Sequence, residues 1–562
     1  MRHATRRWIV LASLLMVMTM VMPFATAGVR AQNSGEKVLR IHQPIYPDVI
    51  DPQVGSALAE ISIWALNYEG LTRLDDKLQT VPAAAESWDF NDDLTKITFH
   101  LRAGLKYSDG SPLTAERFRY AAERTCDPYV AGGYQYILGD ILVGCNELAT
   151  LNSAGAGTPV VVDEAAYEQA KKNLGVKVID DQTIEFDLLA PAPYFPTVAG
   201  LWVLFPAKQE LIEAGGADWW KDPTKQIGNG PFQITKIDEG QLVSFAPNAN
   251  YWGGTPKLDT IEYVYINDSD TALEAYKSGD IDILNPDPAQ LPAIKDDPDL
   301  GSQLTVYASA NTWYLNLNLT QKPFEDLKVR QAFAYAFDRE TYCTEILQGT
   351  CVPAYSWVPD DVAGSIKTEE YTFDPAKAKQ ALADSTYGSP DKLPEIKYFY
   401  SSDDPLNTTR AEWIAGQYRD ILGVELTLEP TDGTTLSALR RDPKTYPQFS
   451  IYNWYQDYPD AQDWLSVYWT CGARFAQRVG YCNKQFDELA GKGDTQAKLD
   501  DRVPYYQQAG QILLDDLPGP PIFHAANYFL VKPNVTGWTG VSIDGYWPGE
   551  RVSALTIDKT PE

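Results

Sequence analysis

Histidine and methionine are scarce in this chain of 562 residues, and their scarcity excludes several kinds of chemistry. Of the four histidines, the three beyond the first residues, His42, His100 and His524, lie far apart. Residues so scattered do not predict a zinc site or a Ser-His-Asp triad. The GxSxG, HExxH, GxGxxG and P-loop motifs are missing as well. We therefore expect no catalytic residue, no metal and no cofactor.

Long apolar runs are absent after the first 31 residues. No later segment approaches the ~18 consecutive apolar residues of a membrane-spanning helix. The N-terminus has three arginines within seven residues, an apolar run over 8–22 and alanines up to Ala31. This pattern predicts a signal peptide over residues 1–31, cleaved after Ala31 to leave a soluble protein. All five methionines lie within the first 22 residues, which marks the leader as a chemically distinct segment.

Cysteine first appears at Cys126, far beyond the leader. Because a lipoprotein signal ends at the cysteine that takes the lipid, the lack of such a lipobox cysteine predicts no lipid anchor. We expect an exported protein in the periplasm or at the exterior of the cell envelope, where disulfides can form. The sequence leaves the pairing open, and we take sequence neighbours as candidates: Cys126 with Cys145, Cys343 with Cys351, and Cys471 with Cys482.

Basic residues are outnumbered by acidic ones. The 47 Lys and Arg against 76 Asp and Glu give a formal net charge of −29 at pH 7. So acidic a chain does not favour nucleic acid or an anionic membrane surface as a partner. Its length exceeds what one hydrophobic core organises, which predicts two or three domains in a monomer.

Two segments follow a strand, helix, strand pattern. In residues 257–284 a strand of alternating pattern precedes a helix and a second strand over 281–284. In residues 423–454 a strand at 424–428 leads through a helix at 435–441 into a strand at 449–454. Right-handed units of this kind build mostly parallel sheets covered by helices. One unit in each half of the chain predicts two α/β lobes.

Three further local patterns concern structure alone. Apolar residues at helical spacing predict one amphipathic helix over 329–347. Asp374 followed by Pro375 predicts a helix start, because aspartate accepts from free amides and proline fits the first turn. Residues 152–160, rich in glycine and alanine, predict a surface loop.

A series of blocks in a fixed order carries a family resemblance. In residues 87–118, Ile97, Phe99 and Leu101 lie on one face of a predicted strand, followed by a turn and a helix that starts near Thr114. The other blocks are NYEGLTRLD at 67–75, GNGPFQI at 228–234, ANYWGGTPKLDTI at 249–261 and YLNLNLTQKPFEDLKVRQAFAYAFDRE at 314–340. Over nearly the whole mature chain, the sequence resembles solute-binding protein family 5 of ABC importers, the family of oligopeptide- and dipeptide-binding proteins.

The resemblance implies an α/β, two-lobed periplasmic-binding-protein-like fold of type II with an extra domain. Its divisions are a first lobe from residues 32–70, 206–311 and 524–562, an extra domain of that lobe from 71–205, and a second lobe from 312–523. The chain would cross between the lobes near residues 311 and 523, and such crossings act as a hinge.

The candidate site follows the strand at 449–454. Ligands of open α/β sheets collect beyond the carboxyl ends of the strands, which is where Asp457 lies. In peptide-binding relatives, the resemblance implies, the matching aspartate pairs with the ligand's α-ammonium, and the aromatic matching Trp454 lines the same pocket. We take Asp457, Trp454 and Tyr455 as ligand-binding candidates, and we interpret Asp460 and Asp463 as turn and helix-start residues.

One position departs from the family pattern. Some tripeptide-binding relatives have an arginine six residues before the aspartate to meet the ligand's carboxylate, and this chain has Ile451 there. Either longer ligands bind with a free carboxyl end, or another cation serves. Arg440 and Arg441 are available, although an arginine at a solvated helix end is the usual case.

These features predict an extracytoplasmic solute-binding component of an ABC importer, which binds a peptide between its lobes and delivers it to the permease subunits in the membrane. An oligosaccharide-binding protein on the same scaffold is the alternative, because 15 Trp and 33 Tyr could stack on sugars; Asp457 argues against it. A secreted hydrolase with two carboxylates across a cleft also stays open.

Overall fold

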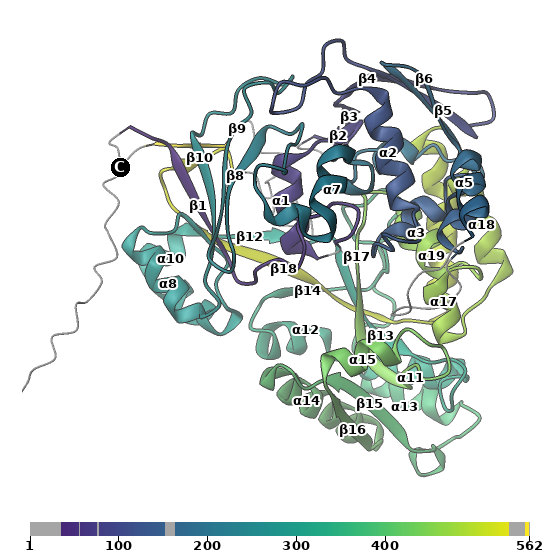
Figure 1. Cartoon of the computed structure of the whole chain (residues 1–562). Helices are drawn as coiled ribbons and strands as arrows, with labels where there is room; N and C mark the ends of the chain where they lie inside the picture. Colours follow the sequence, from purple (N-terminus) through teal and green to yellow (C-terminus); the bar gives the residue numbers. More distant parts are fainter. Residues whose placement is uncertain (1–34, 56, 76–77, 152–162, 539–556, 561–562) are drawn as a thin grey trace, which may run out of the picture.

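The computed structural model describes residues 35–538, except 56, 76–77 and 152–162, together with 557–560. Within them the chain forms two lobes joined by long strands (Figure 1). The upper body carries a four-stranded sheet at its top, and the lower lobe contains α11 to α15 with β15 and β16. The predicted leader over 1–31 and the predicted loop over 152–160 lie outside the described residues.

The main sheet runs through both lobes. Its strand order is β16-β15-β17-β13-β18-β11-β1-β10-β9-β8, with β12 and β14 also paired to β18. In chain order these strands are β1 (Val38–Gln43), β8 (Phe232–Asp238), β9 (Leu242–Pro247), β10 (Thr260–Tyr265), β11 (Ile283–Leu284), β12 (Leu304–Ala308), β13 (Asn311–Leu317), β14 (Cys351–Pro353), β15 (Ile396–Ser401), β16 (Leu426–Thr431), β17 (Phe449–Tyr455) and β18 (Pro521–Val531).

Strand β18 connects the two halves of this sheet. Its first residues pair with β13 and β14 of the lower lobe, and its later residues pair with β12 and β11 of the upper body. The chain also crosses between the lobes where β12 ends and β13 begins. These two crossings lie side by side, as a hinge requires.

The smaller sheets belong to the upper body. The four-stranded sheet has the order β4-β5-β7-β6, and two short ladders pair β2 with β3 and β19 with β20. Their bounds are β2 (Thr72–Leu74), β3 (Thr80–Pro82), β4 (Ala85–Phe90), β5 (Lys96–Leu101), β6 (Val176–Asp180), β7 (Thr183–Asp187), β19 (Val535–Thr536) and β20 (Asp558–Lys559). As predicted, Ile97, Phe99 and Leu101 of β5 all face the core.

The helices pack on the main sheet, on the four-stranded sheet and on one another; α2, for example, packs on β6 and β7. In the first half of the chain they are α1 (Leu58–Asn67), α2 (Ala115–Thr125), α3 (Gln135–Gly139), α4 (Cys145–Ala149), α5 (Glu164–Asn173), α6 (Phe195–Val198), α7 (Gln209–Gly215), α8 (Ser269–Ser278), α9 (Leu291–Asp296) and α10 (Pro298–Gln303). In the second half they are α11 (Leu327–Ala336), α12 (Arg339–Thr341), α13 (Pro375–Ala383), α14 (Pro405–Leu422), α15 (Gly433–Leu439), α16 (Ala461–Trp469), α17 (Arg474–Val479), α18 (Lys484–Asp494) and α19 (Leu499–Asp516).

Alternation along the strands of the lower lobe separates two apolar cores. Leu315 and Phe449 face the core that α11, α13 and α14 cover, whereas Tyr314 and Trp454 face the core under α16, α18 and α19. Because successive strand residues point to opposite faces, one ladder of β13 and β17 serves both cores. The carboxyl end of β17 is thereby held rigidly from both sides.

Both predicted strand-helix-strand units are present. Strands β10 and β11 both run parallel to β1, with α8 between them in sequence, and β16 and β17 both run parallel to β15. Asp268 caps the N-terminus of α8 by accepting from the Thr271 amide, and Gly279, with φ 87°, caps its C-terminus. Strand β16 starts two residues later than predicted, whereas helix α15 starts two residues earlier than predicted.

The single helix predicted over 329–347 is wrong. Helix α11 ends at Ala336, because Phe337 has extended backbone and Asp338 begins a new short helix by accepting from the Thr341 amide. The apolar spacing continued through this break and concealed it. The helix predicted at Asp374 is confirmed as α13, with that carboxylate accepting from the Ala376 amide.

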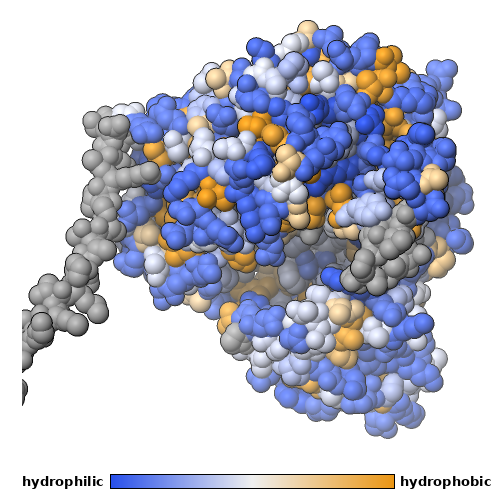
Figure 2. Space-filling model, in the orientation of Figure 1, coloured by the Kyte–Doolittle hydropathy of each residue, from blue (hydrophilic) through white to orange (hydrophobic). Residues whose placement is uncertain are grey.

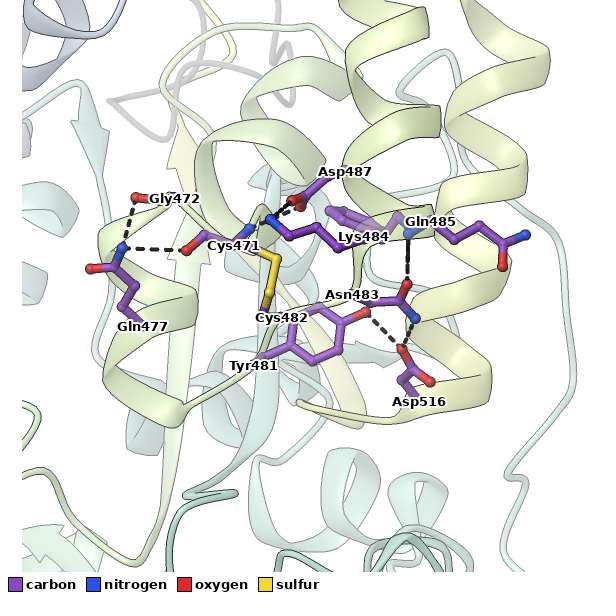
Figure 3. The surroundings of a disulfide bond; sticks show 11 residues. Cys471, Gly472, Gln477, Tyr481, Cys482, Asn483, Lys484, Gln485, Asp487 and Asp516 are labelled. Carbon is purple, nitrogen blue, oxygen red and sulfur yellow. Dashed lines mark hydrogen bonds and ion pairs between the residues drawn. A yellow bond between two sulfur atoms is a disulfide. The ribbon is translucent and has the colours of Figure 1, made fainter.

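The three neighbouring cysteine pairs are all bonded, as predicted. Figure 3 shows the pair Cys471–Cys482, which closes the loop that contains α17. Asp487 of α18 accepts from the Cys471 amide, and Asn483 starts that helix and donates to Asp516 of α19. The bond therefore fixes α17 against α18 and α19.

Candidate functional site

Asp457 lies two residues beyond β17, at the carboxyl edge of the sheet, as predicted. Its side chain is buried, with 7% exposed. Its carboxylate accepts a hydrogen bond from the hydroxyl of Tyr136 on α3, in the upper body. The carboxylate of the lower lobe and the phenol of the upper body thus meet at the junction of the two lobes.

A second carboxylate holds Asp457 in place. Asp463 is fully buried in the first turn of α16, and its Oδ2 accepts from the Asp457 amide and from Trp454 Nε1, each at 3.1 Å. Its Oδ1 has no hydrogen-bond partner among the described residues. The sequence interpretation of Asp463 as a helix-start residue missed this positioning role. Its location six residues after a predicted ligand residue was the available signal.

Burial and the proximity of the two carboxyl groups disfavour their charged forms. Burial raises the pKa of Asp457 to about 7, against hydrogen bonds from Tyr136 and Tyr134 and the charge of Arg474, which lower it. Burial, and then the charge of Asp457, raises the pKa of Asp463 well above its usual range. A buried site with two neighbouring carboxyls, neither of them in an ion pair within the described part of the chain, is suited to receive a cationic group.

Aromatic and amide contacts enclose the site. The Arg474 guanidinium lies 4.0 Å over the Tyr136 ring. Tyr458 stacks on Tyr194 of the upper body at 6.2 Å between centroids, and Gln462 Nε2 donates to the Tyr194 hydroxyl at 3.3 Å. These cross-lobe contacts exclude water around Asp457, which strengthens any charge pair formed there.

The other two predicted site residues point in opposite directions. Trp454 is buried among the lower-lobe helices, 5.0 Å from both Tyr468 and Phe475 between centroids, and supports Asp463. Tyr455 pairs with Asn311 at the start of β13, and burial raises its pKa. The structure therefore places Asp457 at the junction of the lobes, whereas Trp454 lies in the apolar core of the lower lobe.

A pocket of about 350 Å³ is lined by Ile451, Tyr452 and Asn453 of β17, before the end of the strand that carries Asp457. Of the described residues that line it, the only charged ones are two cations, Arg410 and Arg440, in a chain of strongly negative net charge. Its aromatic lining consists of Trp313, Tyr342, Tyr398, Phe399, Tyr400, Tyr452 and Phe523. We call it the arginine pocket. Ile451, the departure from the family pattern, also lines it.

Arg440 is a wall of this pocket and not a solvated helix end. Its Nη2 donates to the Ile451 carbonyl at 3.2 Å, and its guanidinium lies 4.4 Å over the Tyr452 ring. Its Nε is buried without a partner among the described residues. Arg441, by contrast, is exposed. From the sequence, both arginines were candidates for binding a carboxylate. Which of them is buried could not be predicted, because their positions along the chain do not determine how they pack.

The arginine pocket faces the space between the lobes. Burial and then the charge of Asp287 raise the pKa of Tyr528, and the charge of Arg410 lowers it. Tyr528 pairs with β12 in the upper body, so Arg410 acts across the gap between the lobes. Figure 2 shows the surface hollowed between the upper body and the lower lobe.

Two kinds of feature are absent from the described residues. They contain no group of three or more His, Cys, Asp or Glu placed to hold a metal ion. No helix within the described ranges is long and apolar enough to cross a membrane.

Comparisons with known proteins agree with this geometry. The family model for bacterial extracellular solute-binding proteins, family 5 Middle, matches residues 79–475. The probable deoxycholate-binding periplasmic protein YgiS of Escherichia coli is 30% identical over 90% of this chain and 91% of its own. The dipeptide-binding protein DppE of Bacillus subtilis is 28% identical over 90% of each chain. Among solved structures, OppA of Burkholderia pseudomallei has a TM-score of 0.74 at 25% identity, covering 94% of this chain and 99% of its own.

Proposed function

This chain belongs to family 5 of the bacterial extracellular solute-binding proteins, and from that premise we propose that it captures a peptide between its lobes for the membrane permease of an ABC importer. The family resemblance and the two-lobed α/β fold predicted from the sequence are confirmed. The observation that carries the peptide assignment is the buried carboxylate of Asp457 at the junction of the lobes.

The amino end of a peptide suits this position. An ammonium enclosed between the lobes loses its water and needs a fixed carboxylate. Asp457 supplies that charge, and Asp463 fixes its backbone. Relatives with dipeptide- and oligopeptide-binding names support the same assignment.

The carboxyl end suits the arginine pocket. Asn453 lines this pocket and lies four positions before Asp457, so at about 3.3 Å per residue the two are at most about 13 Å apart. An extended peptide of about four residues therefore reaches from Asp457 to the two arginines. Arg440 takes the role that Ile451 cannot, and the aromatic lining receives an apolar side chain.

The remaining sequence predictions stay with this proposal. The protein works without catalysis, is exported through a leader over 1–31, carries no lipid and acts as a monomer. The first lobe consists of 32–70, 206–311 and 524–562, with the extra domain over 71–205 and the second lobe over 312–523.

Replacing Arg440 by glutamine is expected to weaken a tetrapeptide about tenfold, because a charge-assisted contact with its carboxylate is lost. Calorimetric titration measures this change. The same tetrapeptide with an amidated carboxyl end binds the wild-type and R440Q proteins alike.

The exposed neighbour supplies the control. R441Q removes the same charge one residue away and leaves the affinity unchanged. Equal losses in both variants would mean that only the overall charge matters, and the assignment of the carboxylate to this pocket would fail.

Peptide affinity is also expected to weaken as the pH is lowered. Since the pKa of Asp457 is raised to about 7, the free site is protonated below that pH and must release the proton to bind an ammonium. The dissociation constant therefore rises about tenfold per unit as pH falls from about 7 to 5, and it rises again above about pH 8, where the α-ammonium of the peptide loses its proton. Titrations in buffers of different ionisation enthalpy detect the released proton. D457N abolishes this slope, and an unchanged slope in that variant would contradict the assignment.

A second candidate ligand is an amphipathic carboxylate. The relative YgiS is named as probably deoxycholate-binding, and the arginine pocket joins two cations to an aromatic wall. Such a ligand needs no partner for an ammonium, so its binding would not depend on Asp457. Nothing comparable favours a sugar.

Native mass spectrometry of gently purified protein tests the assignment. Released peptides with free amino ends support it. A bound steroid acid would transfer the assignment to the second candidate, and hexose-spaced masses would overturn both.

A further inference from the structure

A larger cavity, of about 620 Å³, lies behind the hinge and plays no part in the site described above. Phe523 of β18 lines the arginine pocket, whereas its neighbour His524 lines this cavity. Ala525 lines both hollows, so they adjoin at this strand, one on the Phe523 side and the other on the His524 side. We call this second hollow the hinge cavity.

Both chain crossings form its wall. Ser309 lies between β12 and β13, and Ala526 of β18 pairs with the end of β12. The rest of the wall is the lower-lobe segment from Val352 to Glu369. An occupant would therefore touch the two segments whose backbone must change when the lobes move.

The inner part of the cavity offers unused hydrogen-bond acceptors. Ser309 is only 4% exposed, and its hydroxyl has no partner among the described residues. His524 donates from Nδ1 to the Asn311 carbonyl at 2.6 Å, and burial lowers the pKa of its ring. The ring is therefore neutral and leaves Nε2 as an acceptor. A buried, unpartnered hydroxyl costs free energy, which a ligand that donates to it would recover.

The outer part of the cavity is acidic. Asp360, Asp361 and Glu369 are exposed at its rim, against one cation among the described lining residues, Lys367. The charges of Asp360 and Asp361 raise the pKa of the His524 ring against the larger effect of burial, and both residues line the same cavity as His524. Apolar side chains, Val352 and Ile366 among them, line the space.

We propose that the hinge cavity is a second binding site, for a small organic cation that carries another hydrogen-bond donor, of the diamine or amino-alcohol class. The ammonium lies between the rim carboxylates, the alkyl chain contacts the apolar wall, and the second donor reaches the Ser309 hydroxyl, in the same inner part of the cavity as the neutral His524 ring. A bare metal ion is not the occupant, because the described residues offer no set of three metal-binding side chains there. Since the occupant contacts both crossings, it changes the solute affinity of the cleft, and the solute changes its affinity by the same factor.

The probe is 1,4-diaminobutane, titrated calorimetrically into ligand-free full-length protein. We expect one site per chain, with 1-aminobutane at least about tenfold weaker because it lacks the second donor. Absence of heat and of thermal stabilisation with the diamine would overturn the proposal.

A matched pair of variants tests the rim. D360N/D361N is expected to weaken the diamine about tenfold. D500N/D501N removes two adjacent exposed carboxylates at the start of α19 and leaves the affinity unchanged. Equal losses in the two variants would reduce the binding to general charge attraction and overturn the proposal.

Two further variants test whether the diamine lies in the hinge cavity. S309A is expected to remove the preference for the diamine over 1-aminobutane without lowering the unfolding temperature, since its hydroxyl has no partner to lose among the described residues. A fall in that temperature with the preference intact would assign Ser309 a structural role and overturn its part in binding. The diamine keeps its affinity in D457N, whose solute site is disabled; its loss there would place the diamine in the cleft. The proposal does not rest on the peptide assignment, so either can fail alone.

Discussion

Replacement of Asp457 by asparagine is expected to weaken a peptide with a free amino end by at least about 100-fold, because the variant leaves a buried ammonium without its charge partner. Asparagine keeps the size of the side chain and an oxygen that accepts from the Tyr136 hydroxyl, so the junction of the lobes is retained. Calorimetry with a tetrapeptide of free ends measures the loss.

The modified ligand supplies the sharper comparison. An N-acetylated tetrapeptide has no ammonium, and it is expected to bind the wild-type and D457N proteins with equal, weak affinity. D391N removes an exposed carboxylate of the same lobe and serves as the charge control. A D457N protein that still discriminates the free from the acetylated peptide would show that another group receives the ammonium.

The sequence predicted the position of Asp457 because that position follows from local rules. A strand of β-branched and aromatic residues ends at Tyr455, and ligand groups gather beyond such ends. Tyr136 could not be predicted, since it lies 321 residues away in the sequence and only the packing of the two lobes brings it to the carboxylate. The same holds for Arg474, whose place depends on the loop closed by Cys471 and Cys482.

The structure distinguishes buried from exposed residues that the sequence pattern alone could not distinguish. Arg440 and Arg441 look alike in sequence, and only the packing on Tyr452 makes the first a wall of a pocket. Trp454 resembles a ligand contact by its position, yet alternation along β17 turns it toward the lower-lobe helices. The cavity behind the hinge arises from segments far apart in the chain, and no sequence pattern marked it.

The support beneath the site rests on one buried ion pair. Asp460 caps the N-terminus of α16, the helix that carries Asp463. Its carboxylate accepts hydrogen bonds from Nη1 and Nη2 of Arg502, at 2.5 and 2.6 Å. Both residues are buried: Asp460 is 8% exposed and Arg502 is 4% exposed. The same guanidinium also donates to the Gly493 carbonyl and the Tyr506 hydroxyl, which ties α16 to α18 and α19.

D460N is expected to lower the free energy of unfolding by about 3 to 5 kcal/mol, because it leaves the Arg502 charge buried and unpaired. Asparagine keeps an oxygen for the Gln462 amide, so the start of α16 is preserved and the loss reports the charge. Guanidinium unfolding followed by tryptophan fluorescence measures it.

Two comparisons decide whether burial is the cause. Glu488 and Lys492 form a surface pair at 2.6 Å with both side chains about half exposed or more, and E488Q is expected to cost less than about 1 kcal/mol. The double variant D460N/R502M removes the stranded charge and is expected to be more stable than D460N alone. If D460N costs no more than E488Q, the pair does not support α16, and the fixed position of Asp463 must come from the packing of Trp454 and Trp464 alone.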